Sequence, residues 1–321
     1  MGIMKKVLIL TYASDPHADS ICDYFRNTGI EFFRINTDKL IRDFSISFDS
    51  KENIFRVSDN SKHITIDQTW NIWNRRIVDP ETLSDIPKDL EKIITIETKR
   101  TWEGLLISHR GKVINRPQNQ YHANSKIDQI KFVSEFCKEI KIPNTILTNR
   151  PKDVIKFYKE NSKICHKLQQ QTIVEKNGES LIAYTNIVNE NHLENVELIR
   201  RNPCLFQEYI EKAYELRITA LEDKAIGIAI HSQNSERSKI DFRRYDFDNV
   251  NYEKVQLPKK IEDFCRNLIR HYGLSFGQID MIYTSQGEYI FLELNPNGQW
   301  LWLEQQSGYN LTKDIASNLI K

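Results

Sequence analysis

The strongest constraint on the fold of this chain is a pair of short segments, late in the sequence, that carry acidic side chains. Apolar and polar residues alternate over 289–294, which predicts a β-strand with Glu293 on the face opposite its two leucine neighbours. Residues 277–283 form a second predicted strand, and the turn at 285–288 predicts an antiparallel hairpin. Asp280 is then expected beside Glu293.

The polar face of this hairpin carries oxygen atoms of the kind that a hard metal ion prefers. Asn295 comes two residues after Glu293 and is expected on the same face. Two carboxylates and an amide oxygen suit Mg²⁺, which takes near-octahedral oxygen coordination and usually keeps substrate phosphates in its shell. The pattern therefore suggests a nucleotide site, although an ordinary solvated strand face shows the same alternation.

Length and charge exclude several other functions. The chain has 321 residues, enough for two or three packed units, and its net charge of +1 provides no overall field for nucleic acid or an anionic membrane. No hydrophobic run reaches the roughly eighteen residues of a membrane span, and the short run at 7–10 is no signal peptide core. Five cysteines at wide spacings are expected to be reduced packing residues. We therefore expect a cytoplasmic protein with no nucleic-acid or membrane partner.

The first region, residues 1–115, begins with a βαβ pattern that predicts a parallel sheet. The turn after the first strand, Tyr12 to Pro16, lacks the glycine-rich sequence that holds a dinucleotide pyrophosphate, so no nicotinamide cofactor is expected. The expected elements are a strand over Lys6–Thr11, a helix over Ala18–Asn27, a strand over Glu31–Ile35, a small antiparallel extension over residues 44–67, and a strand from Trp70 to Arg76.

The pattern changes at Asn115-Arg116-Pro117, where a second domain is expected to begin. The pair Asn177-Gly178 predicts the tight turn of a hairpin, and Ser232–Lys239 is expected to be a polar, mobile loop. The other expected elements are helices over 125–138, 151–159 and 260–272 and strands over 142–148, 163–168, 206–210, 215–221 and 225–231.

Several side chains in these regions could bind a ligand. Lys167 lies among apolar residues of a predicted strand, where it either extends to solvent or binds an anion. Gln207-Glu208-Tyr209-Ile210 leads from a strand into a connection, where backbone groups and a carboxylate can bind an adenine edge. Glu215 and Arg217 share a strand face, for which a cross-strand ion pair is the simpler explanation. Arg243 supplies a guanidinium, which suits carboxylate or phosphate oxygens.

The order of these features resembles the ATP-grasp superfamily. A lysine before a hairpin, an adenine-binding segment, Glu-x-Arg, Asp-x-Arg, an aspartate and Glu-x-Asn follow one another over about residues 116–300. Five further segments are similar to the peptide-macrocyclising branch, the graspetide synthetases that include microviridin ligases, and they extend the resemblance over nearly the whole chain. These segments are Trp73-Asn74-Arg75-Arg76, Asn36-Thr37-Asp38, Asn115-Arg116-Pro117, Asp241-Phe242-Arg243 and residues 294–300.

The resemblance implies an α/β (α+β) fold, the ATP-grasp fold with an N-terminal Rossmann-like pre-ATP-grasp domain. Residues 1–115 would form that domain, residues 116–200 a central lobe with the hairpin, and residues 201–321 a C-terminal lobe with the Mg/ATP site. The cofactors implied are ATP and two Mg²⁺ ions. The partners implied are the leader and core of a ribosomally made precursor peptide, and a second copy of the chain in a homodimer.

The activity implied is that of a macrocyclising ligase. ATP would phosphorylate a Glu or Asp side chain of the precursor, and a Thr or Ser hydroxyl of the same peptide would attack the acyl phosphate to form an ω-ester. The alternative is an amide ligase that acts on a Lys side chain of the precursor, or on a free amino acid or dipeptide. We favour the ester because the segments at 241–243 and 294–300 are most similar to ester-forming members. A non-catalytic nucleotide- or peptide-binding module is disfavoured because it has no need of catalytic metal ligands.

The resemblance also assigns roles to individual residues. Lys126 and Lys167 would hold the ATP phosphates, and the segment Gln207, Glu208, Tyr209 and Ile210 would hold the adenine. Asp280, Glu293 and Asn295 would bind Mg²⁺. Arg243 would neutralise charge on the γ-phosphate and the acyl phosphate, while Glu215 and Arg217 would orient the reacting groups. The hairpin around Asn177-Gly178 and the N-terminal region are candidates for binding the leader, although Ile173, Val174, Leu181 and Ile182 could equally be packing residues.

Overall fold

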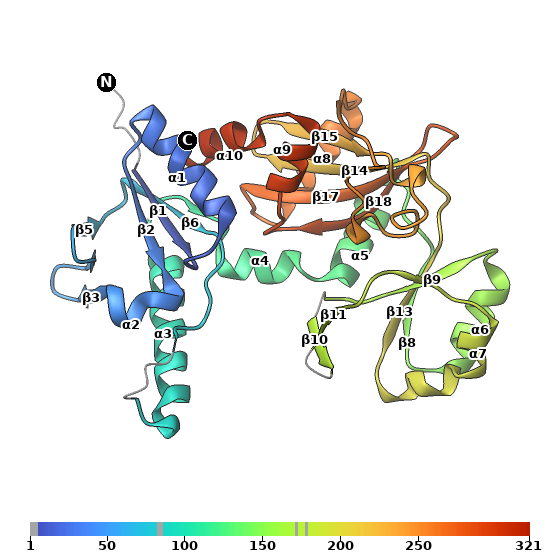
Figure 1. The fold of residues 1–321 in the computed structure, drawn as a ribbon, viewed down its shortest axis with the longest axis horizontal. Helices are drawn as coiled ribbons and strands as arrows, with labels where there is room; N and C mark the ends of the chain where they lie inside the picture. Colours follow the sequence, from blue (N-terminus) through green and yellow to red (C-terminus); the bar gives the residue numbers. More distant parts are fainter. Residues whose placement is uncertain (1–5, 82–85, 171–172, 177–178) are drawn as a thin grey trace.

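The structure is a computed structural model that describes residues 6–81, 86–170, 173–176 and 179–321. Its N-terminal part is built on a four-stranded sheet in the order β2-β1-β6-β7 (Figure 1). All three pairings are parallel, as the βαβ pattern predicts. The strands are β1 (Lys6–Thr11), β2 (Phe32–Asn36), β6 (Trp70–Asn74) and β7 (Val113–Ile114).

Helix α1 (Pro16–Thr28) connects β1 to β2 and has clear signals at both ends. The Asp15 side chain accepts a hydrogen bond from the His17 backbone N–H at 3.1 Å, and proline suits the first helical turn. Gly29 ends the helix with a φ of 71°, a left-handed conformation that is strained for residues with a Cβ. These local signals explain why the first βαβ unit is readable from the sequence.

A small antiparallel sheet and a long helix extend this part of the molecule. The predicted extension is confirmed as β3-β4-β5, but the long helix α3 was not predicted. Figure 1 shows α3 projecting away from the body, and only its second half buries large side chains such as Trp102 and Leu105. The elements are the 3-10 turn η1 (Thr37–Lys39), α2 (Leu40–Asp43), β3 (Ser45–Asp49), β4 (Ile54–Ser58), β5 (His63–Ile66) and α3 (Lys88–Ser108).

The central part contains an antiparallel sheet in the order β12-β9-β13-β8 and a separate hairpin, β10 with β11. The predicted turn at Asn177-Gly178 and the side chains of Ile173, Val174, Leu181 and Ile182 lie outside what the structure describes. Strand β13 comes after residue 200, the predicted end of the central lobe, yet it pairs with β8 and β9 of that lobe. The division into three domains stays a prediction. The elements are α4 (Pro117–Ala123), α5 (Lys126–Phe136), β8 (Thr145–Thr148), α6 (Pro151–Glu160), β9 (Ile164–Lys167), β10 (Ile173–Lys176), β11 (Glu179–Ile182), β12 (Asn186–Ile187), α7 (Glu190–Glu194), η2 (Val196–Arg201) and β13 (Cys204–Glu208).

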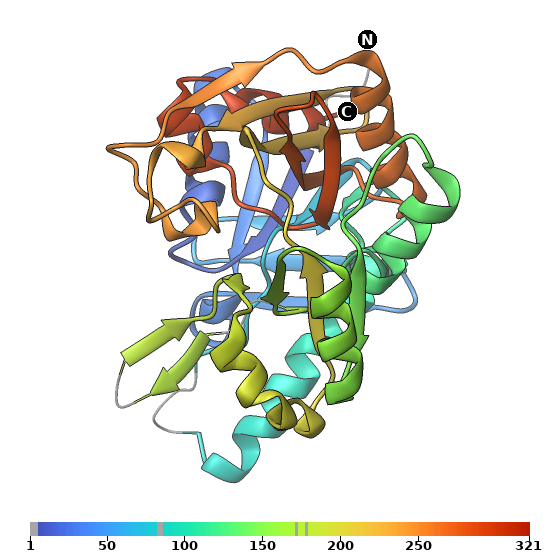
Figure 2. The same cartoon turned by 90° about the vertical axis from the view of Figure 1, so that its right-hand side faces the viewer.

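The C-terminal part is a five-stranded antiparallel sheet in the order β16-β15-β14-β17-β18. Helix α8 packs against three of its strands through a buried apolar stripe that includes Phe264 and Leu268. Figure 2 shows this sheet above the four-stranded sheet of the central part. The elements are β14 (Tyr214–Leu221), β15 (Ala225–Ile230), η3 (Ser232–Asn234), η4 (Phe242–Arg244), β16 (Tyr252–Val255), α8 (Lys259–His271), β17 (Phe276–Tyr283), β18 (Tyr289–Asn295), α9 (Leu301–Ser307) and α10 (Leu311–Leu319).

The N-terminal part and the C-terminal sheet share one hydrophobic core. Helix α10 packs beside α1, and Ile21 and Phe25 of α1 belong to the same buried cluster as Leu311 and Ile315 of α10 (Figure 1). Burying such side chains contributes about 1.5–3 kcal/mol each, so this junction fixes the two parts relative to each other. Helices from both ends of the sequence, α1 and α10, therefore hold the N-terminal sheet against the C-terminal sheet.

The segment Ser232–Lys239, which the sequence predicted to be a polar, mobile loop, contains a 3-10 turn and buried serines, and its mobility stays a prediction. Ser232 and Ser238 are both buried, and the Ser238 hydroxyl donates to the Ser232 carbonyl at 3.0 Å. The Ser235 hydroxyl donates to Asp246 at 2.5 Å. The polar composition suggested solvation, whereas these two hydroxyls donate to a backbone carbonyl and to a carboxylate inside a compact turn.

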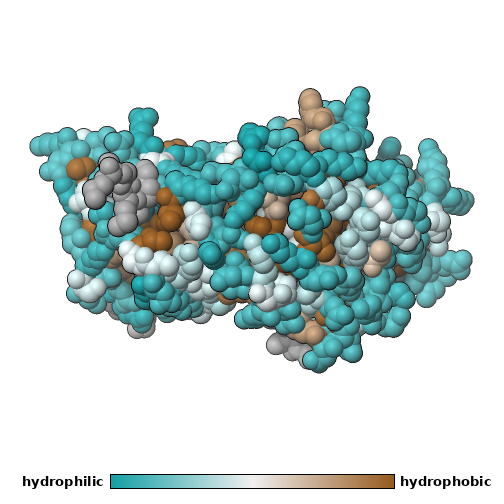
Figure 3. Space-filling view, turned by 90° about the horizontal axis from the view of Figure 1, so that it is seen from above, coloured by the Kyte–Doolittle hydropathy of each residue, from teal (hydrophilic) through white to brown (hydrophobic). Residues whose placement is uncertain are grey.

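Among the described residues, no helix combines the length and apolar character needed to cross a bilayer. The face seen in Figure 3 is mainly hydrophilic, with small hydrophobic areas interrupted by polar side chains.

Candidate functional site

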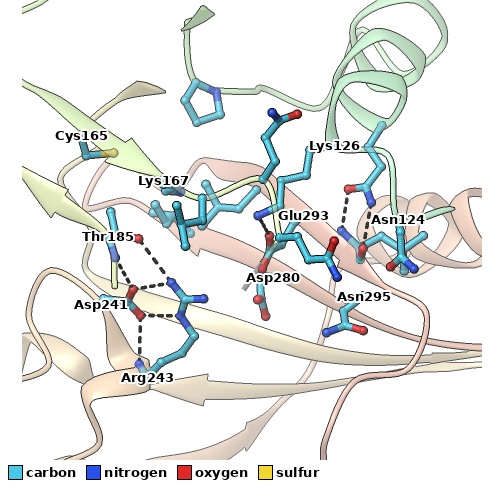
Figure 4. Close-up of a pocket in the computed structure, with 18 of the residues that line it drawn as sticks. Asn124, Lys126, Cys165, Lys167, Thr185, Asp241, Arg243, Asp280, Glu293 and Asn295 are labelled. Atoms are coloured by element: carbon cyan, nitrogen blue, oxygen red, sulfur yellow. Dashed lines mark hydrogen bonds and ion pairs between the residues drawn. The ribbon is translucent and has the colours of Figure 1, made fainter. Parts of the chain in front are cut away.

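A cavity of about 1130 Å³ lies between the central sheet β12-β9-β13-β8 and the five-stranded C-terminal sheet (Figure 4). Ordinary small-molecule sites measure roughly 300–1,000 Å³, so this one has room for more than a single small ligand. The predicted site residues that line it are Lys126, Lys167, Glu208, Tyr209, Ile210, Glu215, Arg243, Asp280, Glu293 and Asn295. The fold thus brings together side chains that are dispersed between residues 126 and 295 of the sequence.

Gln207 and Arg217 are the two predicted site residues that do not line the cavity. Gln207 is buried, and its side-chain amide donates to the Thr145 hydroxyl at 3.1 Å. Arg217 lies opposite Asp280 across β14 and β17, and its Nη1 donates to the two carboxylate oxygens at 2.6 and 2.7 Å. A cross-strand ion pair was the simpler explanation for Arg217, and it is the one found, with Asp280 of β17 as the partner.

The predicted hairpin is formed by β17 and β18, and it places Asp280 directly opposite Glu293. The register then shifts, because Met281 faces Phe291 and leaves Leu292 as an extra residue on β18. Such a bulge bends a strand and re-aims its side chains. Leu292 lines the cavity together with Glu293, so the simple alternation expected from the sequence is wrong at this point.

Helix α5 brings Lys126 to the carboxylate of Glu293. Ser125 caps the helix by accepting a hydrogen bond from the Asp128 N–H, and Lys126 Nζ lies 2.5 Å from Glu293 Oε2 (Figure 4). Gln129, one turn later, donates to the Leu294 carbonyl at 2.8 Å and accepts from the Leu294 N–H at 2.8 Å. This double hydrogen bond fixes α5 against β18, so the Lys126–Glu293 geometry is set by the backbone.

Three cations act on the Glu293 carboxylate in this part of the cavity. Burial raises the pKa of Glu293, but the nearby Lys126, Arg243 and Lys167 outweigh it and hold that pKa at about 2. Burial raises the pKa of Asp280, and the carboxylate of Glu293 adds to the rise. Burial lowers the pKa of Lys167. The arrangement favours additional negative charge at the site, as phosphate groups would supply.

Arg243 is held rigidly by Asp241. The Arg243 Nε and Nη2 atoms donate to the two Asp241 oxygens at 2.8 and 2.5 Å, and the Thr185 N–H donates to the same carboxylate at 2.9 Å (Figure 4). Burial raises the pKa of Asp241, but the Arg243 hydrogen bond and charge outweigh it and bring the pKa well below its usual range. A bidentate pair of this kind fixes the guanidinium plane as well as its charge.

Lys212 lines the cavity and was not identified from the sequence. Its ammonium pairs with Glu215 and donates to the Ile240 carbonyl at 3.1 Å, and the two side chains of the pair are only 3% and 6% exposed. Burial raises the pKa of Glu215. The one signal in the sequence was a lysine three residues before the glutamate, which is indistinguishable there from an exposed turn.

The predicted adenine segment forms one wall of the cavity. The Glu208 N–H donates to the Asn144 carbonyl at 2.8 Å, and the Tyr209 N–H donates to the Lys163 carbonyl at 2.9 Å. Burial raises the pKa of Tyr209 to about 12. Because these two N–H groups are already used, an adenine would bind other groups of the segment, and this role stays a prediction.

The oxygen atoms of Asp280, Glu293 and Asn295 fit a hard divalent cation. Asp280 and Glu293 are paired across the two strands, and the Asn295 amide oxygen accepts one hydrogen bond, from the Asn297 N–H at 3.0 Å, which leaves a second lone pair. Within the described part of the chain, no group of three His, Cys, Asp or Glu side chains suits a metal. The amide oxygen is therefore needed to complete the donor set, as oxygen coordination of Mg²⁺ permits.

Comparisons with known proteins agree with this geometry. Residues 6–121 match the model of the MvdD pre-ATP grasp domain, and residues 123–319 match that of the RimK-like ATP-grasp domain. Among solved structures, a RiPP-associated ATP-grasp ligase from Chryseobacterium gregarium, in complex with ADP and a leader and core peptide, is 27% identical with a TM-score of 0.88, covering 99% of this chain and 96% of that one.

Two macrocyclases from Microcystis aeruginosa MRC are also similar over their whole length. MdnC, bound with the precursor peptide MdnA, is 27% identical with a TM-score of 0.85, covering 98% of this chain and 99% of that one. MdnB is 26% identical with a TM-score of 0.77, covering 98% of this chain and 99% of that one. A comparison with curated proteins found no match.

Proposed function

The chain belongs to the family of RimK-like ATP-grasp domains, and on this premise we propose that it closes rings in a ribosomally made precursor peptide. It is an ATP-dependent ligase, and the bond we propose is an ω-ester between a Glu or Asp side chain and a Thr or Ser hydroxyl of the same peptide. The similarity to a ligase in complex with ADP and a leader and core peptide supports this proposal.

One observation carries the proposal: three cations converge on the Glu293 carboxylate inside a cavity that is larger than ordinary small-molecule sites. Lys126 pairs with Glu293, and both Lys167 and Arg243 lower the pKa of the same carboxylate. Phosphoryl transfer depends on alignment and charge neutralisation more than on covalent help from the protein. The remaining volume of the roughly 1130 Å³ cavity would accommodate a peptide segment.

The side chains support a two-step mechanism. Lys126 and Lys167 hold the ATP phosphates, and Arg243, fixed by Asp241, neutralises charge on the γ-phosphate as a substrate carboxylate oxygen attacks it. ADP leaves, and the hydroxyl oxygen of a Thr or Ser then attacks the acyl carbon. The bond between that carbon and the phosphorylated oxygen breaks, and the departing phosphate keeps one carboxyl oxygen and takes up the hydroxyl proton. When bound by Asp280, Glu293 and Asn295, Mg²⁺ supplies further positive charge to the phosphate oxygens.

Ring closure depends on holding the two peptide groups together away from water. Fixing reactants in a productive geometry can lower a barrier by roughly 7–11 kcal/mol. Glu215 lies in the cavity wall with Lys212, and Arg217 anchors Asp280, so these residues orient the reacting centre from the five-stranded sheet. Exclusion of water also protects the acyl phosphate from hydrolysis.

The proposed partners are the leader and core of the precursor and a second copy of this chain in the cytoplasm. A two-fold dimer is the commonest assembly of soluble proteins. The β10–β11 hairpin is a candidate for binding the leader, and we expect its deletion to raise KM for a leader-bearing peptide. An unchanged KM would count against that role.

Mass spectrometry of a precursor co-expressed with the protein tests the proposal. The substrate to try first is a short peptide rich in Thr, Ser, Glu and Asp from a neighbouring reading frame. Loss of one water per ring is expected, whereas a product that only gains amino acids would reject ring closure in favour of ligation to a free amino acid or dipeptide. Mild alkaline hydrolysis separates the bond types, because an ester regains the water and an amide with a Lys side chain does not.

A further inference from the structure

Arg75 is the most deeply buried cation among the described residues, and the proposed chemistry gives it no role. It is 1% exposed and lies at the end of β6, where the N-terminal part meets the loop after β18. Its guanidinium sits 6.0 Å from the ring centre of Trp73 and 5.3 Å from that of Trp300. A buried guanidinium is costly unless it is well paired, so its partners indicate what it is for.

The polar contacts of Arg75 converge on one residue of the loop after β18. Its Nη1 donates to the Asn297 side-chain oxygen at 2.6 Å and to the Asn297 carbonyl at 3.1 Å, and the Asn297 amide donates back to the Arg75 carbonyl. On its other side, Arg75 Nε lies 3.3 Å from Asp15, which also accepts from the Thr11 hydroxyl at 2.6 Å. Hydrogen bonds to Arg75 therefore hold Asn297 against the N-terminal part of the molecule.

Asn297 in turn orients a candidate metal ligand. Its backbone N–H donates to the Asn295 Oδ1 atom at 3.0 Å, and both residues line the cavity. This hydrogen bond requires the oxygen of the Asn295 amide, not its nitrogen, to point toward Asn297. The amide is otherwise exposed and free to rotate, so the conformation of Asn297 decides how the oxygen is presented.

We propose that Arg75 is a positioning residue of the metal site, which it controls from the N-terminal part through Asn297 and the amide of Asn295. The inference rests on the proposed function, since it assumes that Asn295 binds the divalent cation. Residues that orient metal ligands typically change metal affinity by about 10- to 100-fold when they are replaced. Arg75 would also make the metal site depend on how the N-terminal part packs against the loop.

A matched arginine distinguishes this role from general support of the fold. Arg116 is likewise a structural arginine, and its guanidinium donates to the carbonyls of Leu106 at 2.8 Å and His109 at 3.0 Å at the end of α3. It does not line the cavity. Replacing Arg116 should therefore lower stability without a specific effect on metal binding.

The experiment measures Mn²⁺ binding by electron paramagnetic resonance in the presence of saturating ADP, without turnover. The full-length chain is compared with Arg75→Lys, Arg75→Gln, Asn297→Ala, Arg116→Gln and the double variant Arg75→Lys/Asn297→Ala. We expect Arg75→Gln and Asn297→Ala to weaken Mn²⁺ binding about 10-fold or more, Arg75→Lys to lose less, and Arg116→Gln to bind as the wild type does. The double variant should bind Mn²⁺ as tightly as Asn297→Ala does, because Arg75 acts on the metal site only through Asn297.

The results separate the possible failures. Wild-type Mn²⁺ affinity in Asn297→Ala and Arg75→Lys would overturn the inference, as would an equal loss in Arg116→Gln. Asn297→Ala retains Arg75 and so provides the test if Arg75→Gln does not fold. If the wild type itself bound no Mn²⁺ with ADP, the proposed function would fail instead.

Discussion

Lys126 Nζ lies 2.5 Å from Glu293 Oε2, and this contact joins the first turn of α5 to the acidic hairpin. A cation therefore already lies against one of the carboxylates proposed to bind Mg²⁺. Both groups would serve the same phosphates, Lys126 by direct contact and Glu293 through the metal. This explains why the pair is built into a cavity wall, where its side chains are 21% and 26% exposed, rather than on an open surface.

Replacing Glu293 by Gln should abolish ATP consumption. The variant keeps the shape of the side chain but removes the negative charge that a divalent cation needs, and it leaves Lys126 without its partner. A drop in kcat of at least about 100-fold is expected, comparable to the loss of other groups that stabilise transition-state charge. The measurement is the rate of ADP release with a precursor peptide.

Glu288→Gln is the matched control for that variant. Glu288 lies in the turn of the same hairpin and pairs with Lys141 on the surface, away from the cavity. Its replacement should leave ADP release close to the wild-type rate. Wild-type turnover in Glu293→Gln would remove Glu293 from the metal site.

The same carboxylate should make stability depend on pH. Burial opposes ionisation of Glu293, but its cationic neighbours prevail and lower its pKa from 4.5 to about 2 in the folded chain. A lowered folded-state pKa means stabilisation that is present above about pH 4.5 and is lost as the pH falls toward 2. Between pH 6 and pH 3.5 the free energy of unfolding should fall by about 1 kcal/mol more in the wild type than in Glu293→Gln. Urea unfolding at both pH values measures this difference, and parallel pH dependences would contradict it.

Arg243→Lys should lower kcat much more than it raises KM for ATP. Lysine keeps the charge but cannot form the two hydrogen bonds that fix the guanidinium on Asp241, so charge neutralisation in the transition state loses its geometry. A loss of about 100- to 1,000-fold in kcat is expected. Arg244→Lys is the control, because Arg244 lies over the Tyr184 ring at 5.3 Å and does not line the cavity. A rise confined to KM would show that Arg243 serves ground-state binding only.

The sequence predicts the parts of this fold whose signals are local. Helix α1, the parallel start of the N-terminal sheet and the β17–β18 hairpin follow from local residue patterns, although the helix begins at Pro16 and not at the expected Ala18. The bulge at Leu292 does not follow, because an extra residue in a strand depends on what packs against it. The buried serines of Ser232–Lys239 were misjudged for the same reason, since polar residues look solvated until their partners are known.

The sequence predicts the candidate site only in part, because the order of residues does not determine how their side chains pair in the folded chain. The order of the charged residues indicated Lys126, Lys167, Arg243 and Glu293, and the fold brings them to one cavity. Their order could not show that Arg217 pairs with Asp280 across β14 and β17 and does not itself line the cavity. Such pairing is a tertiary choice that sequence spacing does not determine.

Lys212, which the sequence did not reveal, should be essential for stability because it compensates the buried carboxylate of Glu215. Breaking a buried pair by removing one partner typically costs about 3–5 kcal/mol, whereas replacing both partners by uncharged groups can be nearly neutral. Lys212→Met should therefore lower the free energy of unfolding by about that amount, and Lys212→Met/Glu215→Gln should recover a large part of it.

The sign of the pH dependence gives an independent check on Lys212→Met. Burial already raises the pKa of Glu215, and loss of the Lys212 charge would raise it further. A folded-state pKa above the unfolded value destabilises the protein at high pH and ceases to do so as the pH falls through it. Lys212→Met should therefore come closer to wild-type stability at pH 5 than at pH 7.5, as measured by urea unfolding. If the deficit were the same at both pH values, lost packing of the lysine stem would explain the variant instead of an uncompensated charge.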